Sequence, residues 1–256
     1  MNKTILALTA AMTLGALPAI SHAEDDPLSF NVSVTSDYRY RGISQSRLKP
    51  ALQGGVDYAL PAGFYIGAWG STIRWIKDAG TINNVDTGSA DVEVDLYGGY
   101  KGEIQKDLSY DVGLLQYLYP GEHLGRIANA HSPNTLELYG ALTFGPATVK
   151  YSHALTRLFG TANSKGSGYL EAAATFDVGG GVSLTPHIGY QKVRRNSDFS
   201  YTDYSLTASK EWFGLTFSAA VVGADTNDIN AAPAYASPSG KDLGRTGVVV
   251  AVKKTF

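Results

Sequence analysis

Charged side chains recur at every second position in several short apolar segments of the chain. Asp91, Glu93 and Asp95 alternate with aliphatic residues over positions 91–96. Because side chains of a β-strand point alternately to opposite faces, this spacing places the three carboxylates on one face and the aliphatic groups on the other. A row of carboxylates on a water-filled wall stabilises cations electrostatically. The pattern predicts a polar face that selects ions.

The same parity rule assigns further charged or titratable residues to this polar, inward-facing wall. The predicted pore-lining residues are Asp37, Arg39, Arg41, Asp57, Asp91, Glu93, Asp95, Asp111, Glu137, Lys150, Glu171, His187, Asp203, Arg245 and Lys253. Nine of them are acidic and five are basic, which predicts a weak preference for cations. The alternative is that these charges pair across a narrow lumen and plug it.

Residues that could catalyse a reaction are few. The histidines outside the first 23 residues are His123, His131, His153 and His187, and no Gly-x-Ser-x-Gly motif is present. Ser152 precedes His153 directly, but a pair of sequence neighbours is more typical of a strand end than of a nucleophile and its base. Paired inner carboxylates could resemble a glycosidase, yet a hydrated pore wall explains them without special geometry. We predict no catalytic residue.

Composition gives no indication of a cofactor, a metal centre or a nucleic-acid partner. The chain has no Cys, which excludes thiolate metal sites, disulfides and a lipid-modified Cys. The polar stretch 225–230 lacks the Gly and the distal Glu of a calcium loop. The formal charge is −2 for the 256 residues, and there is no basic patch. We therefore predict no cofactor, no metal and no nucleic-acid binding.

The elements that must position the charges are short alternating segments bounded by Gly, Pro, Asn and Asp. They predict twelve strands, or ten or fourteen if a hairpin is merged or missed. The candidate ranges are 28–40, 51–60, 63–73, 91–101, 107–118, 134–144, 146–155, 168–177, 181–192, 202–210, 213–223 and 245–256. Five short turns alternate with six long loops, so both ends of the sheet lie on the short-turn side.

Together these features predict a transmembrane antiparallel up-and-down β-barrel, all-β, spanning residues 24–256. Short periplasmic turns, longer external loops and an even strand number are typical of Gram-negative outer-membrane barrels. A soluble sandwich or lipocalin would also alternate, with its polar face outside. Two features of the chain ends, described next, favour the membrane barrel.

The two chain ends both indicate export to the outer membrane. Residues 1–23 have one charge at Lys3, an apolar core and a small-x-small ending, as in a secretory signal peptide. The alternating segment at 245–256 ends on Phe256, which would place an aromatic ring at the membrane boundary. Lys254 stands on the apolar face, where it can snorkel to the interface. We expect this strand to contact the barrel-assembly machinery, outer-membrane lipids to surround the barrel, and both mature termini to be periplasmic.

Aromatic residues gather near the predicted strand ends, as an interfacial girdle requires. The predicted members are Tyr38, Tyr40, Phe64, Tyr100, Tyr117, Tyr119, Phe144, Phe176, Trp212, Phe213 and Phe256. The alternative is ordinary β-propensity, which also favours Tyr and Phe.

Several segments, in order along the chain, go beyond generic barrel patterning. They are SDYRYRGISQS (36–46), QGGVDY (53–58), GFYIGAWGS (63–71), LYGGY (96–100), YPG (119–121), ELYG (137–140) and YTDY (201–204). The chain thereby resembles the TorF family, which is named for a presumed porin role. The resemblance implies an outer-membrane barrel and a porin, and it implies no particular solute.

The expected function is passive diffusion of small hydrophilic solutes with a weak cation preference. The alternative is a narrow, non-conducting barrel that binds a ligand or partner, or serves structurally, through its external loops. The sequence leaves open the solute, whether the lumen is plugged, the oligomeric state and the role of the loops.

Overall fold

The computed structural model describes residues 27–256, so the predicted signal peptide lies outside the described residues. Twelve antiparallel strands form one closed wall, with β10 continued by the short β11 after a break at Thr175. The wall strands are β1 (Leu28–Thr35), β4 (Ala51–Ala59), β5 (Phe64–Thr72), β6 (Val92–Gln105), β7 (Leu108–Leu118), β8 (Thr135–Phe144), β9 (Ala147–Ala154), β10 (Gly168–Ala174) with β11 (Phe176–Asp177), β12 (Val182–Lys192), β13 (Tyr201–Trp212), β14 (Leu215–Asp225) and β17 (Gly247–Thr255). The predicted twelve-stranded barrel is confirmed.

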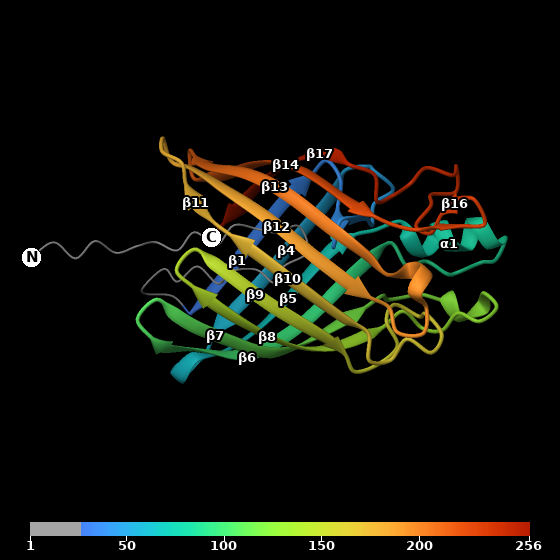
Figure 1. Ribbon diagram of the computed structural model, residues 1–256, viewed down its shortest axis with the longest axis horizontal. Helices are drawn as coiled ribbons and strands as arrows, with labels where there is room; N and C mark the ends of the chain where they lie inside the picture. The colour runs from blue at the N-terminus through green and yellow to red at the C-terminus, as the bar shows by residue number, and fades with distance from the viewer. Residues whose placement is uncertain (1–26) are drawn as a thin grey trace, which may run out of the picture.

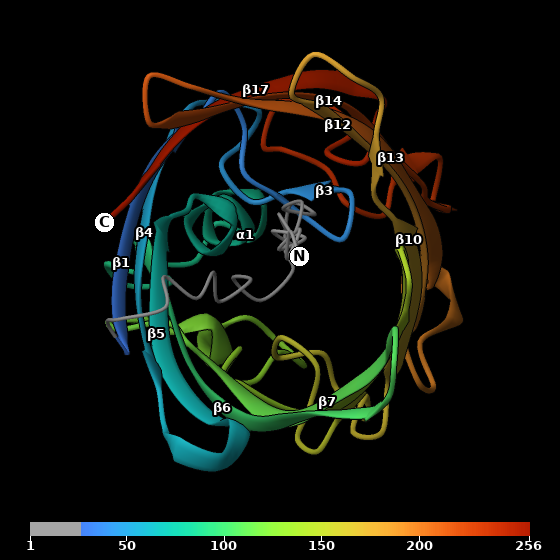
Figure 2. The same cartoon turned by 90° about the vertical axis from the view of Figure 1, so that its left-hand side faces the viewer.

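The barrel closes between its first and last strands. β1 pairs with β17 from Asn31↔Thr255 to Thr35↔Ala251, and every other wall strand pairs with its sequence neighbours. Closure leaves no strand edge unpaired, which a sheet needs in order to cross hydrocarbon. The strands are tilted in the side view (Figure 1) and form a ring in the end view (Figure 2).

The outer face of the wall is apolar and the inner face is polar. Along β1 the exposed residues are Phe30, Val32 and Val34, whereas Ser33 and Thr35 between them are buried inside the barrel. The same alternation recurs in β12 and β13. An apolar exterior around a polar interior is the arrangement of a membrane-spanning barrel and the reverse of a soluble one.

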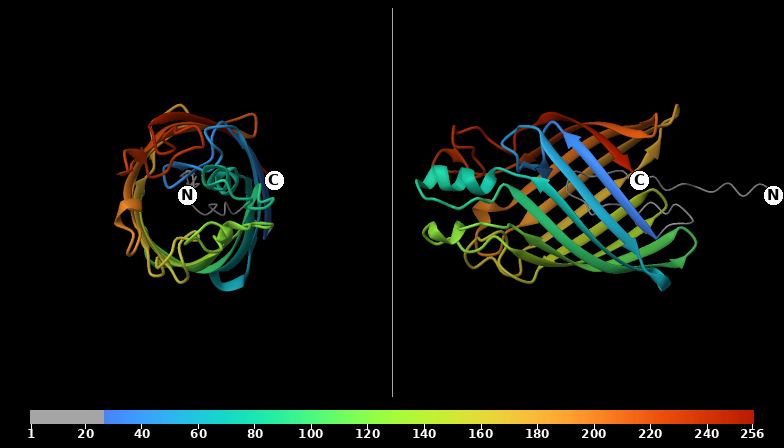
Figure 3. Two further views of the ribbon diagram at one scale, coloured as in Figure 1. Left: turned by 90° about the vertical axis from the view of Figure 1, so that its right-hand side faces the viewer. Right: turned by 180° about the vertical axis from the view of Figure 1, so that it is seen from behind.

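The two ends of the barrel differ in the length of their connections, as predicted. Figure 1 shows tight turns and the C-terminus at one end, and α1 (Trp75–Asn83) with the long loops at the other. The small elements η2 (Leu124–Arg126), η3 (Ser197–Phe199), β15 (Asp228–Ile229) and β16 (Ala232–Pro233) also lie in long loops, and η1 (Pro61–Gly63) forms a tight turn. The view from behind shows the same division (Figure 3). Within residues 27–256, no helix is long and apolar enough to cross a membrane.

The first predicted strand is too long. β1 ends at Thr35, and residues 36–50 leave the wall and fold into the lumen, where β2 (Arg39–Tyr40) and β3 (Ile43–Ser44) form a small hairpin. Figure 2 shows β3 inside the ring of wall strands. We call residues 36–50 the inner hairpin. Its alternating sequence resembles a strand locally, but its side chains find partners on the far wall.

Part of the predicted aromatic girdle lies inside the barrel. Tyr38, Tyr40, Tyr117 and Tyr119 are all at most 8% exposed and form one cluster in the lumen. The predicted girdle residues near the short turns, in contrast, are exposed: Phe64, Phe144, Phe176, Trp212, Phe213 and Phe256. The prediction was wrong for the four tyrosines because the inner hairpin and the tyrosines facing it pack together.

Candidate functional site: the barrel lumen

The inner hairpin turns at Arg41 and Gly42, which both have positive φ, 46° and 80°. Two successive positive φ values define the type I′ turn that favours Gly in tight hairpins. A Cβ on Gly42 would lie 2.7 Å from the Cβ of Asp203 and 2.8 Å from the carbonyl oxygen of Gly223. The tip therefore reaches the β13–β14 side of the barrel, and only glycine fits there.

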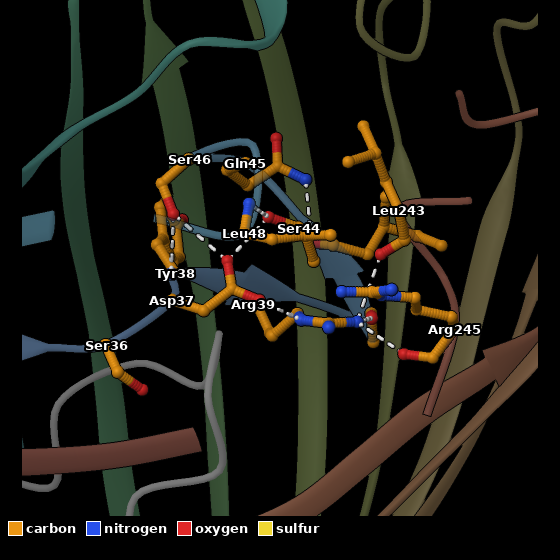
Figure 4. A network of polar contacts seen from close by, with 12 residues as sticks. Ser36, Asp37, Tyr38, Arg39, Ser44, Gln45, Ser46, Leu48, Leu243 and Arg245 are labelled. Carbon is orange, nitrogen blue, oxygen red and sulfur yellow. Dashed lines mark hydrogen bonds and ion pairs between the residues drawn. The ribbon is translucent and has the colours of Figure 1, made fainter. Parts of the chain in front are cut away.

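Asp37 organises the base of the inner hairpin (Figure 4). Its carboxylate accepts hydrogen bonds from Arg39 Nε at 2.5 Å, Ser44 Oγ at 2.5 Å and Ser46 Oγ at 3.1 Å. The Asp37 and Arg39 side chains are 8% and 2% exposed. A buried ion pair needs such additional hydrogen bonds to offset its loss of hydration.

Arg39 fastens the hairpin to the loop before β17. Its Nη1 donates to the carbonyl oxygens of Gly42, Leu243 and Arg245 at 2.8, 3.0 and 3.2 Å. The backbone N–H of Ser44 also donates to the carbonyl of Leu243 at 3.0 Å. The prediction that Asp37, Arg39 and Arg41 line the strand wall is corrected here, since all three lie on the inner hairpin.

Arg41 fastens the tip of the hairpin to one residue of β8 and one of β12. Its guanidinium donates to both carboxylate oxygens of Glu137, at 3.1 and 2.7 Å, and to Oε1 of Gln191 at 2.6 Å. The same guanidinium lies over the rings of Tyr40 and Tyr169, 4.8 and 4.2 Å from their centroids. The hairpin thus crosses the lumen and is held at its base and at its tip.

Two lumen carboxylates have no cationic partner among the described residues. Glu93 is 2% exposed and accepts hydrogen bonds from Tyr38 at 2.5 Å and Tyr119 at 2.7 Å. Asp95, two residues further along β6, is 8% exposed, and its Oδ1 has no hydrogen-bond partner. Burial of an ionised carboxylate without a countercharge is costly, and a carboxylate that stays ionised beside a water-filled path attracts cations.

The remaining predicted residues form two lumen groups. In one, Asp57 accepts from Tyr97 at 2.5 Å, and Asp111 accepts from Tyr65 at 2.6 Å. In the other, Glu171 lies 3.8 Å from Lys150 Nζ and 3.1 Å from His187 Nε2, and Asp203 accepts from Tyr169 at 2.9 Å. Lys253 is half-buried on β17. These seven predicted residues and Glu137 lie on the inner face of the wall, and their role in lining a conducting pore stays a prediction.

Two predicted residues do not belong to the strand wall. Asp91 precedes β6 and its carboxylate pairs with Lys77 of α1 at the mouth of the barrel. Arg245 precedes β17 and is exposed. Both predictions are corrected, because β6 begins one residue later and β17 two residues later than the sequence pattern predicted.

Sequence reasoning missed other residues of the lumen. Lys101 has the same parity as Asp95 on β6 and is half-buried, so the parity rule could have found it. Gln191 was not singled out because its contact with Arg41 joins residues 150 positions apart. Within residues 27–256, no group of three or more His, Cys, Asp or Glu side chains is placed to hold a metal ion.

The closed wall, apolar outside and polar inside, defines a membrane-spanning β-barrel. Residues 21–256 match the family described as "Bacterial protein of unknown function (Gcw_chp)", and the chain belongs to that family. No curated protein matches the chain. The resemblance to the TorF family stays a prediction.

Two of the solved structures with a similar fold are porins. The chain is similar to the KdgM porin, with 9% identity, a TM-score of 0.53, and coverage of 90% of this chain and 98% of that one. It is also similar to the NanC porin, with 8% identity, a TM-score of 0.50, and coverage of 89% and 98%. At such identity the likeness concerns the fold alone.

Proposed function

We propose that this protein is a narrow outer-membrane pore that lets small hydrophilic solutes, and cations more readily than anions, diffuse across. The apolar outer face would contact outer-membrane lipids, with the long loops outside the cell and both mature termini in the periplasm. The likeness of the fold to two porins supports this proposal. No catalytic step is proposed.

The lumen carboxylates are the main observation behind the cation preference. The charges of Arg39 and Arg41 are neutralised by Asp37 and Glu137. These two arginines therefore do not offset the other carboxylates of the lumen. Glu93 and Asp95 stay without a cation in the described lumen. Carboxylates at a constriction stabilise a passing cation and repel an anion. The Asp57 and Asp111 carboxylates would extend this potential toward the short-turn end.

The last strand supports the proposed contact with the barrel-assembly machinery. The Phe256 side chain is 71% exposed at the end of β17, while its N–H donates to the carbonyl of Phe30 at 2.9 Å. An exposed aromatic residue at the end of the closing strand would be available to a partner before β1 and β17 pair.

The inner hairpin favours a second candidate function, a non-conducting barrel that acts through its external loops. The hairpin crosses the lumen, and its buried Tyr38 and Tyr40 lie in one cluster with Tyr117 and Tyr119. Twelve-stranded barrels lie between small barrels filled by side chains and large ones that conduct freely. The two functions therefore differ in whether water and ions pass beside the hairpin.

Single-channel recording of the refolded mature protein in planar bilayers tests the proposal. A heat-dependent shift in gel mobility first establishes that the barrel is folded. We expect discrete conductance steps and, in a salt gradient, a reversal potential that indicates mild cation preference. The double variant Glu93→Gln/Asp95→Asn should move this potential toward zero, whereas Asp91→Asn at the mouth should leave it close to the wild-type value.

The possible outcomes separate the two functions. A folded barrel without steps would reject the pore and favour the non-conducting barrel. If the Glu93→Gln/Asp95→Asn variant shows steps with the wild-type reversal potential, the pore is retained. The assignment of the cation preference to these two carboxylates is then rejected.

A further inference from the structure

A cluster of basic side chains surrounds a pocket at the long-loop end of the barrel. The pocket has a volume of about 590 Å³ and lies between the β9–β10 and β12–β13 loops. Its charged or titratable lining residues are His153, Arg157, Lys165, Arg194 and Arg195. No acidic residue lines it. This concentration of positive charge contrasts with the formal charge of −2 for the whole chain.

The four permanent cations of this pocket have no ionic partner among the described residues. Three other cations of the long loops do have an ionic partner: Arg47 pairs with Asp78, Lys77 with Asp91 and Arg126 with Asp86. No described ion pair includes Arg157, Lys165, Arg194 or Arg195. Like charges gathered without a counterion repel one another, so the cluster is a favourable site for an anion.

The pocket lies where the outer wall passes from lipid to water. On β9 the outward-facing residues Val149 and Tyr151 are 51% and 48% exposed, and His153 follows at the next outward position. On β12 the outward-facing Tyr190 is 49% exposed, Lys192 follows at the next outward position, and Arg194 lies in the turn just after the strand. Aromatic residues directly below basic ones are typical of the boundary between acyl chains and headgroups.

Hydrogen bonds between the two loops hold the pocket in shape. Arg194 donates from its backbone N–H to Ser167 Oγ at 3.0 Å and from Nη1 to the carbonyl of Lys165 at 3.3 Å. Asn196 Nδ2 donates to the carbonyl of Ala162 at 2.8 Å. Because the loops are already joined, less conformational entropy is lost when a ligand binds.

We propose that this pocket binds the phosphorylated headgroup of a lipid in the outer leaflet. Arg and Lys side chains form charge-assisted hydrogen bonds with phosphate oxygens, and Arg can do so with two bonds at once. The acyl chains of the lipid would lie along Val149, Tyr151 and Tyr190 below the pocket. This inference uses the outward orientation of the long loops from the proposed function, but it does not require that the barrel conducts.

Binding of bisphosphorylated lipid A to the folded, detergent-solubilised barrel tests the proposal, with native mass spectrometry as the measurement. We expect a saturable complex with the wild-type protein. The Arg194→Gln/Arg195→Gln variant should bind at least ~10-fold more weakly, because two charge-assisted hydrogen-bonding groups are lost. The matched control Lys49→Gln/Lys241→Gln removes two exposed cations from other long loops and should bind like the wild type.

Two further comparisons test whether charge and phosphate are recognised and whether a loss of binding reflects misfolding. Arg194→Lys/Arg195→Lys keeps the charges and should recover most of the affinity. Dephosphorylated lipid A should bind weakly to every variant. Equal binding of both lipids, or equal loss in the control variant, would overturn the proposal. Binding of inorganic phosphate with the same affinity as lipid A would show a phosphate site without a lipid role and would also overturn it. Single-channel conductance should be the same in the Gln variant and the wild type, which keeps this test separate from that of the pore.

Discussion

Arg41 is a buried cation that needs its neighbouring partners. It sits at the tip of the inner hairpin, 7% exposed, between Glu137, Gln191 and two aromatic rings. A guanidinium is always ionised in a protein, so it can be buried only with its partners in place. Its contribution is therefore best measured together with that of Glu137.

Replacing Arg41 by Met should destabilise the barrel by about 3–5 kcal/mol, because Glu137 would be left as an uncompensated buried charge. The double variant Arg41→Met/Glu137→Gln should recover a large part of this loss. Urea titration of the folded, heat-modifiable band measures the free energy of unfolding. If both variants were equally destabilised, the coupling between the two residues would be refuted.

Substitution of Gly42 tests the contact between the hairpin tip and the wall. Gly42→Ala and Gly240→Ala both place a Cβ at positive φ, 80° and 75°, but the Cβ at 240 would meet nothing within 4 Å. The backbone strain, about 1 kcal/mol, is common to both variants. We expect Gly42→Ala to be more destabilising than Gly240→Ala in the same urea titration. Equal effects would place the tip away from β13 and β14.

At the scale of elements, the inner hairpin is an insertion between two strands that could have been joined directly. Thr35 of β1 already pairs with Ala51 of β4, so the wall needs no residues from 36–50. The hairpin instead contributes Tyr38, Tyr40 and Arg41 to the lumen. It occupies part of the lumen and connects distant strands.

Replacing residues 37–49 by a short Gly-Ser turn should increase the single-channel conductance several-fold, because it removes the segment that crosses the lumen. The register Thr35↔Ala51 shows that a short turn can join the strands. A matched control shortens the β15–β16 turn, residues 229–232, at the barrel mouth and should leave conductance close to the wild-type value. An unchanged conductance after removal of the hairpin would mean that the pathway is limited elsewhere.

At the scale of the whole molecule, the barrel depends on the separation of its two faces. The outward-facing side chains must stay apolar near the bilayer centre, while tolerance for charge increases toward the interfaces. Leu206, 46% exposed, is central in β13, and Trp212, 59% exposed, is at its short-turn end. These two residues of one strand allow the depth dependence to be measured.

Leu206→Arg should lower the free energy of unfolding in liposomes by about 2–4 kcal/mol. In Trp212→Arg the inserted charge should lower it by less, because position 212 lies near the interface. Denaturant unfolding in lipid vesicles measures both values. Similar losses in liposomes would contradict the assignment of the apolar band to hydrocarbon, since they would show no dependence on depth.

The sequence by itself determined the parity of the strand faces and the alternation of short turns with long loops, and it predicted twelve wall strands with ten or fourteen left open. These features are local, because the period of two and the turn residues are set by neighbours along the chain. They were enough to place Glu93, Asp95, Glu171 and Asp203 on the inner face.

Only the tertiary structure decided what fills the lumen. Residues 36–41 continue the alternation of β1 and look like strand from sequence, yet they leave the wall because Arg39 and Arg41 find acceptors at Leu243, Glu137 and Gln191. These contacts join positions 96 to 204 residues apart. A local pattern cannot reveal which buried charges will be neutralised by such distant partners. For that reason the polar lumen was predictable, whereas the inner hairpin that crosses it was not.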